Sequence, residues 1–62
     1  MSAAPELSSV ATALSELTDR VAELAEHLSS DARDDLATAL YEVERSLGAA
    51  ARRLETMVDE LR

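Results

Sequence analysis

Large apolar residues recur along two stretches of the chain at spacings that alternate between three and four residues. The first stretch contains Leu7, Val10, Leu14, Leu17, Val21, Leu24 and Leu28. The second contains Leu36, Leu40, Val43, Leu47, Ala50, Leu54, Met57 and Leu61. This heptad pattern keeps one stripe of an α-helix facing a partner helix. The sequence therefore predicts an all-α, coiled-coil-like protein with two amphipathic helices.

The heptad positions are lettered here so that the two alternating sets of the stripe are a and d. The a positions are Leu7, Leu14, Val21, Leu28, Leu40, Leu47, Leu54 and Leu61. The d positions are Val10, Leu17, Leu24, Leu36, Val43, Ala50 and Met57. We predict that this seam, apart from Ala50, is the surface through which the protein self-associates.

The two runs are out of phase, which predicts a turn between them. Continuing the first register beyond Leu28 would place Asp31 and Asp35 in the apolar seam. Ser29, Ser30 and Asp31 are residue types that are poor in the middle of a helix and good at its N-cap. We expect one hairpin domain over residues 1–62, with helices at about 5–28 and 32–61, a turn at about 29–31 and a disordered segment at 1–4.

One continuous helix with a local shift of register is the alternative to the hairpin. The junction contains neither Gly nor Pro, and Leu28, Ala32, Leu36 and Leu40 are spaced by four residues. Such a helix would be roughly 85 Å long at about 1.5 Å per residue. A single helix of that length is an unfavourable shape for so short a chain, so the hairpin is the preferred interpretation.

Small residues beside the seam widen the apolar stripe on one side. The e positions, each directly after a d position, are Ala11, Thr18, Ala25, Ala37, Glu44, Ala51 and Val58. Apolar a, d and e positions together are typical of a helix that touches two neighbours. A two-helix hairpin cannot supply two neighbours to each helix. We therefore expect homodimerisation into an antiparallel four-helix bundle.

Length and composition favour the same conclusion. A chain of 62 residues is marginal as an isolated fold, and it contains no Cys and a single His. Disulfides, thiolate metal sites and multi-His metal sites within one chain are therefore excluded as a source of stability, which leaves oligomerisation as the main expectation. The absence of Lys, Asn, Ile and Phe indicates a GC-rich, bacterial genome.

The formal charge of −7 argues against direct binding to nucleic acid or to an anionic membrane. No stretch approaches the roughly 20 apolar residues of a transmembrane helix, and residues 1–6 lack the features of a signal peptide. We expect a soluble cytoplasmic protein.

No arrangement of polar residues predicts catalysis, a metal site or a cofactor. Glu23 and His27 form a Glu-x-x-x-His sequence, but the neighbouring seam residues are Leu24 and Leu28, so both polar side chains fall outside the seam. His27 is better explained as a cation near the end of the first helix. We expect a protein that is not an enzyme and holds no cofactor.

The second helix carries a polar line that we predict to dock a protein partner. Tyr41, Arg45, Gly48 and Arg52 share one face, roughly opposite the seam. Tyr and Arg are enriched at interfaces, and Gly48 permits close approach of a backbone. The alternative is that these residues are solvated and have no partner. Arg45, Arg52 and Arg53 could also hold an anionic ligand.

From these features we expect a non-enzymatic protein–protein interaction module that binds itself and an unidentified protein partner. An acidic regulator of a nucleic-acid-binding protein, acting as a DNA mimic, an antitoxin or an anti-sigma-like factor, is the alternative. A ligand- or metal-binding helical bundle is a third possibility.

Overall fold

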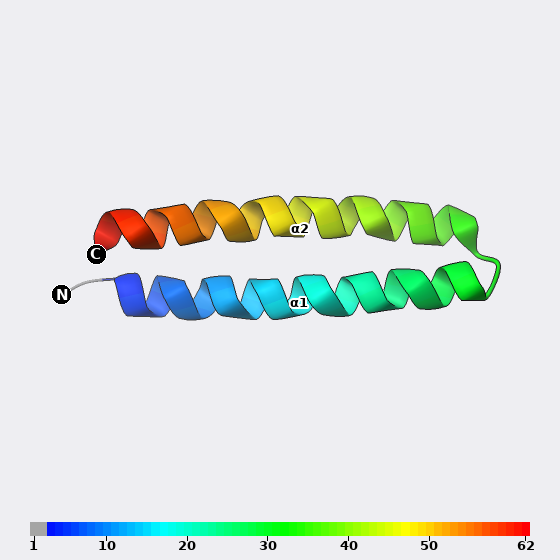
Figure 1. Ribbon diagram of the computed structural model, residues 1–62, viewed down its shortest axis with the longest axis horizontal. Coiled ribbons are helices and arrows are strands. Elements are labelled where there is room, and N and C mark those ends of the chain that lie inside the picture. Colours follow the sequence, from blue (N-terminus) through cyan, green and yellow to red (C-terminus); the bar gives the residue numbers. More distant parts are fainter. Residues whose placement is uncertain (1–2) are drawn as a thin grey trace.

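The computed structural model describes residues 3–62, which form two helices, α1 (Ala4–Ser30) and α2 (Asp34–Leu61), joined by a three-residue turn. The helices run antiparallel and lie side by side over their whole length, so the start of α1 and the end of α2 lie together at the end away from the turn (Figure 1). The predicted all-helical hairpin is confirmed, and the single continuous helix is wrong.

The helix bounds differ slightly from the predicted ones. Pro5 stands in the first turn of α1, as expected from its missing N–H group. The turn falls at residues 31–33, two residues later than the expected 29–31. Of residues 1–4, for which we predicted disorder, the first two lie outside the described residues and Ala4 begins α1.

Backbone hydrogen bonds at the C-terminus of α1 explain why the helix continues to Ser30. The N–H of Arg33 donates to the carbonyl oxygen of Leu28 at 2.8 Å, and the N–H of Ala32 donates to that of Ser29 at 3.2 Å. This is the Schellman pattern, in which the residue after the C-cap adopts a left-handed conformation. Here that residue is Ala32, with φ of 61°. The sequence did not predict this turn, because Gly usually occupies this position and Ala32 stands there instead.

The residue expected to cap α2 is also different. Arg33 occupies the N-cap of α2, and no side chain bonds to the free N–H groups there. Asp34 and Asp35 lie in the first turn of α2, where carboxylates interact favourably with the helix dipole. Electrostatics rather than a Ser or Asp cap therefore supports this helix end.

The two helices contact each other through small residues. The buried side chains within residues 3–62 are those of Ala4, Ala11, Ala25, Ala37, Ala51 and Val58. They recur at intervals of seven or fourteen residues within each helix and occupy the e positions, to which Ala4 also belongs. The two other e positions, Thr18 and Glu44, are half-buried. The contact between α1 and α2 is thus centred on e rather than on the a and d seam.

The small side chains allow the helices to approach closely. The Cα atoms span 50 × 13 × 10 Å. Subtracting the ~4.6 Å diameter of one helical Cα cylinder from the 13 Å width leaves about 8 Å between the helix axes, the short end of the usual range. A leucine in place of a buried alanine at e would have to push the helix axes apart.

Candidate interaction surface

The predicted seam divides into two halves in the structure. Seven of its residues are half-buried beside the small-residue contact, namely Leu7, Leu14, Val21, Leu28, Leu40, Leu47 and Leu54. The other seven are exposed, namely Val10, Leu17, Leu24, Leu36, Val43, Met57 and Leu61. Their exposed fractions run from 43% at Leu36 to 56% at Leu24. The hairpin by itself thus leaves every d position exposed to solvent.

The a and d residues of both helices lie on one broad face of the hairpin. Two antiparallel helices are related by a two-fold axis perpendicular to the plane that contains them, so equal heptad letters fall on the same side. Around each of the two helices, the a and d positions lie on one side of the e positions, and the b and f positions lie on the other side. We call the side formed by the a and d residues the apolar face. No charged residue occupies an a or d position within either helix.

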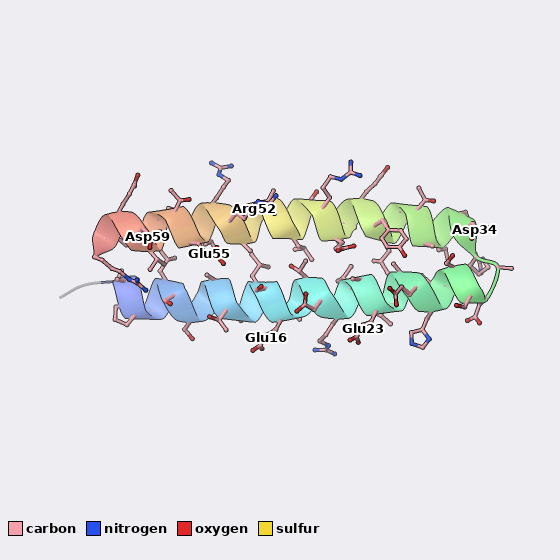
Figure 2. The ribbon with its side chains drawn as sticks, viewed as in Figure 1. Glu16, Glu23, Asp34, Arg52, Glu55 and Asp59 are labelled. Atoms are coloured by element: carbon pink, nitrogen blue, oxygen red, sulfur yellow. The ribbon has the colours of Figure 1, made fainter. Side chains whose placement is uncertain are left out.

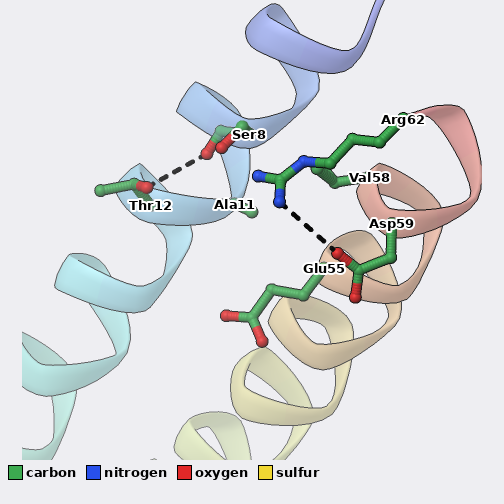
Figure 3. A pocket seen from close by; sticks show the side chains of 7 residues that line it. All are labelled: Ser8, Ala11, Thr12, Glu55, Val58, Asp59 and Arg62. Atoms are coloured by element: carbon green, nitrogen blue, oxygen red, sulfur yellow. Dashed lines mark hydrogen bonds and ion pairs between the residues drawn. The ribbon is translucent and has the colours of Figure 1, made fainter.

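A depression on the opposite face agrees with this geometry (Figure 3). It lies at the open end of the hairpin, measures about 170 Å³, and is lined by Ser8, Ala11, Thr12, Glu55, Val58, Asp59 and Arg62. All of these occupy b, e or f positions. The Thr12 hydroxyl donates to the carbonyl oxygen of Ser8 at 3.1 Å, and a guanidinium nitrogen of Arg62 lies 4.0 Å from an oxygen of Asp59. The depression is polar and contains two carboxylates, those of Glu55 and Asp59.

The predicted docking strip lies on this polar side of the molecule. Tyr41 and Gly48 are at b positions, and Arg45 and Arg52 are at f positions. Tyr41 is 42% exposed, both arginines are exposed, and Gly48 is half-buried. The structure therefore places the four residues on one accessible line, turned away from the apolar face.

The three arginines of α2 do not form one cluster. Arg45 and Arg52 share the f line, whereas Arg53 is at g, on the outer edge of the apolar face. Within residues 3–62 the ion pairs up to 4.0 Å join Arg33 to Asp35 and Arg62 to Asp59. The helix geometry thus places Arg53 on a different side of α2 from Arg45 and Arg52. The three side chains therefore do not converge on a single anion.

Carboxylates that could bind metal are spread over the outside of the hairpin. Glu16 and Glu23 project from the edge of α1 that faces away from α2 (Figure 2). Within residues 3–62, no three His, Cys, Asp or Glu side chains come close enough to hold a metal ion. A shallow depression lined by Glu23, Glu26, His27 and Ser30 opens on the outer side of α1.

Neither α1 nor α2 is long and apolar enough to cross a membrane. Comparison of the chain with protein-family models, with curated proteins and with solved structures found no match. The geometry of the two faces is therefore the basis for the functional argument.

The sequence pattern did not identify which apolar positions join the two helices. The signal was present in the spacing of Ala4, Ala11 and Ala25 on α1 and of Ala37 and Ala51 on α2, which are seven or fourteen residues apart. The prediction was based on the a and d positions because the large residues there account for most of the apolar surface area. The structure instead centres the internal contact on the small residues at e, with the large residues at a half-buried beside it and those at d exposed.

Proposed function

We propose that this chain is a non-enzymatic interaction module in which two hairpins stack their apolar faces to form a four-helix bundle. The observation that carries the proposal is that no large side chain within residues 3–62 is fully buried. Burial of a leucine contributes about 1.5–3 kcal/mol, whereas burial of a single methyl or methylene group contributes about 0.8 kcal/mol. A lone hairpin thus leaves most of its available apolar stabilisation unused.

The size of the apolar face suits a second copy of the chain. The face is 50 Å long and roughly 18 Å wide, since two helices of about 10 Å diameter lie about 8 Å apart. Its area is therefore roughly 900 Å² per copy, close to the ~800 Å² per partner of a stable interface. The repeated d positions on both helices supply the knobs and holes that a matching face needs.

Sedimentation at micromolar concentration tests the self-association. We expect the chain to sediment as a dimer and the variant Leu17→Asp to lose the dimer, because the substitution places a charge at the centre of the apolar face. Ser15→Asp is the matched control, since it adds the same charge at a b position on the polar face and should leave the dimer intact. A folded, monomeric wild-type protein would contradict the proposal.

We further propose that the outer, polar face docks a protein partner through Tyr41, Arg45, Gly48 and Arg52. Stacking of the apolar faces turns this strip outward on both sides of the bundle, so the module would offer two equivalent docking surfaces. The double variant Tyr41→Ala with Arg45→Ala should retain helicity and the dimer while losing the partner that co-purifies from the native host. Unchanged co-purification of that partner would contradict the docking role.

The acidic regulator remains the second candidate because charge is concentrated near the turn. Glu23, Glu26, Asp31, Asp34 and Asp35 lie in this region with a single arginine. An inhibitor that imitates DNA would bind its target less tightly as ionic strength rises. Docking through the apolar face or the Tyr41 strip would depend on salt only weakly. The slope of affinity against salt therefore distinguishes the two functions.

A further inference from the structure

We infer that the two hairpins of the bundle stack with their turns at opposite ends, so that α1 lies on α1 of the second copy and α2 on α2. This inference rests on the proposed self-association. The alternative has both turns at the same end and places α1 of each copy on α2 of the other. The size of the side chains along the apolar face distinguishes the two arrangements.

Each level of the apolar face contains one residue from each helix. Residues an equal number of steps from the ends of the turn, Ser30 and Asp34, lie at the same height in an antiparallel pair. Counted outward from the turn, the levels are Leu28/Leu36, Leu24/Leu40, Val21/Val43, Leu17/Leu47, Leu14/Ala50, Val10/Leu54, Leu7/Met57 and Ala3/Leu61. Large and small levels are unevenly distributed: the two levels that contain alanine lie in the half away from the turn.

With both turns at the same end, every level of one hairpin would pack on the same level of the second hairpin. The Leu14/Ala50 level would then contribute two leucines and two alanines, while the adjacent Leu17/Leu47 level would contribute four leucines. A bundle with layers this unequal would have voids at the alanines and crowding at the leucines, and both are costly in a packed core.

With the turns at opposite ends, each level meets a different one. The Leu14/Ala50 level then packs on Leu17/Leu47 of the second copy, so a single alanine is surrounded by three leucines. At the ends of the bundle, Ala3/Leu61 packs on Leu28/Leu36 in the same way. Small side chains thus face large ones across the interface, and the layers become nearly equal in volume.

Charge acts in the same direction, although less strongly. Residues 23–35 contain five acidic residues and one arginine, a net −4 of the total −7. Turns at the same end would bring two such regions together. Turns at opposite ends place the two regions at opposite ends of a hairpin 50 Å long. Even the two Glu23 residues are then roughly 22 Å apart along the axis at about 1.5 Å per residue, which exceeds the ~8 Å Debye length at physiological salt.

The absence of Cys permits a direct test with single spin labels in the full chain. Ser30→Cys labels the end of α1 at the turn, and Ser46→Cys labels the middle of α2; both sites are exposed. Electron double-resonance distances should be about 40 Å or more between the two Ser30 labels, from the ~1.5 Å rise per residue, and below about 25 Å between the two Ser46 labels.

The Ser46 label separates the failure of this inference from the failure of the proposed function. Short distances at both sites would mean that the bundle forms with its turns together, which overturns the inference alone. Absence of any interspin distance at both sites would mean that no dimer forms, which overturns the proposed function and the inference with it.

Discussion

A guanidinium nitrogen of Arg52 lies 3.5 Å from the position that a Cβ atom on Gly48 would occupy. The arginine side chain therefore folds back over the preceding helical turn, against the backbone of Gly48. This distance is an ordinary van der Waals contact, so the site has room for a methyl group. Gly48 is not required by the packing of the hairpin.

Replacement of Gly48 by alanine should consequently stabilise the protein. Alanine is favoured over glycine in the middle of a helix by about 1 kcal/mol, and nothing within the hairpin clashes with it. Urea denaturation followed by circular dichroism at a fixed protein concentration measures the change. A loss of stability would contradict the finding that the hairpin has room for a methyl group at this position.

Ala32→Gly should also stabilise the hairpin, for a different reason. Ala32 holds a left-handed backbone conformation with φ of 61°, which costs an L-residue roughly 1 kcal/mol and glycine very little. We expect a gain of up to about 1 kcal/mol in the free energy of unfolding, reduced by the greater freedom of glycine in the unfolded chain. Ala39→Gly, within α2, is the control and should be destabilising.

Ala51→Leu should destabilise the protein because Ala51 lies in the close contact between the helices, where it is only 6% exposed. A leucine there must push the axes apart, and overpacking of this kind costs about 1–3 kcal/mol. Ala49→Leu, two residues earlier on the exposed side of α2, makes the same chemical change and should be nearly neutral. Thermal unfolding of the two variants compares them directly. Equal stability of the two would contradict a contact centred on the e positions.

Glu44→Ala should increase stability modestly. Glu44 is the one ionisable residue among the e positions and is half-buried, whereas the other e positions hold small or apolar side chains except for Thr18. The substitution also breaks no ion pair, because the ion pairs within residues 3–62 do not include Glu44. We expect a gain of up to about 1 kcal/mol. Glu42→Ala, at an exposed c position, is the control and should show only the smaller effect of helix propensity.

Much of the fold could be predicted from periodicity. Alternating spacings of three and four residues identified both helices, and the phase change after Leu28 identified the turn. The position of the turn was less accessible, because Ala32 adopts a conformation for which a sequence gives no warning when glycine is absent. Helical geometry alone brings Tyr41, Arg45, Gly48 and Arg52 onto one face of α2, and their role in docking a partner stays a prediction.

The sequence by itself determined that the chain forms two amphipathic helices and that each has an apolar stripe too wide for one neighbour. Only the tertiary structure decided how that stripe is divided. The alanines at e bring the two axes to about 8 Å, since small side chains permit the closest approach. The larger residues at d cannot fit into so narrow a space, so they remain exposed on the apolar face. A heptad pattern specifies which side of a helix is apolar, but the choice of neighbour depends on side-chain volume in three dimensions.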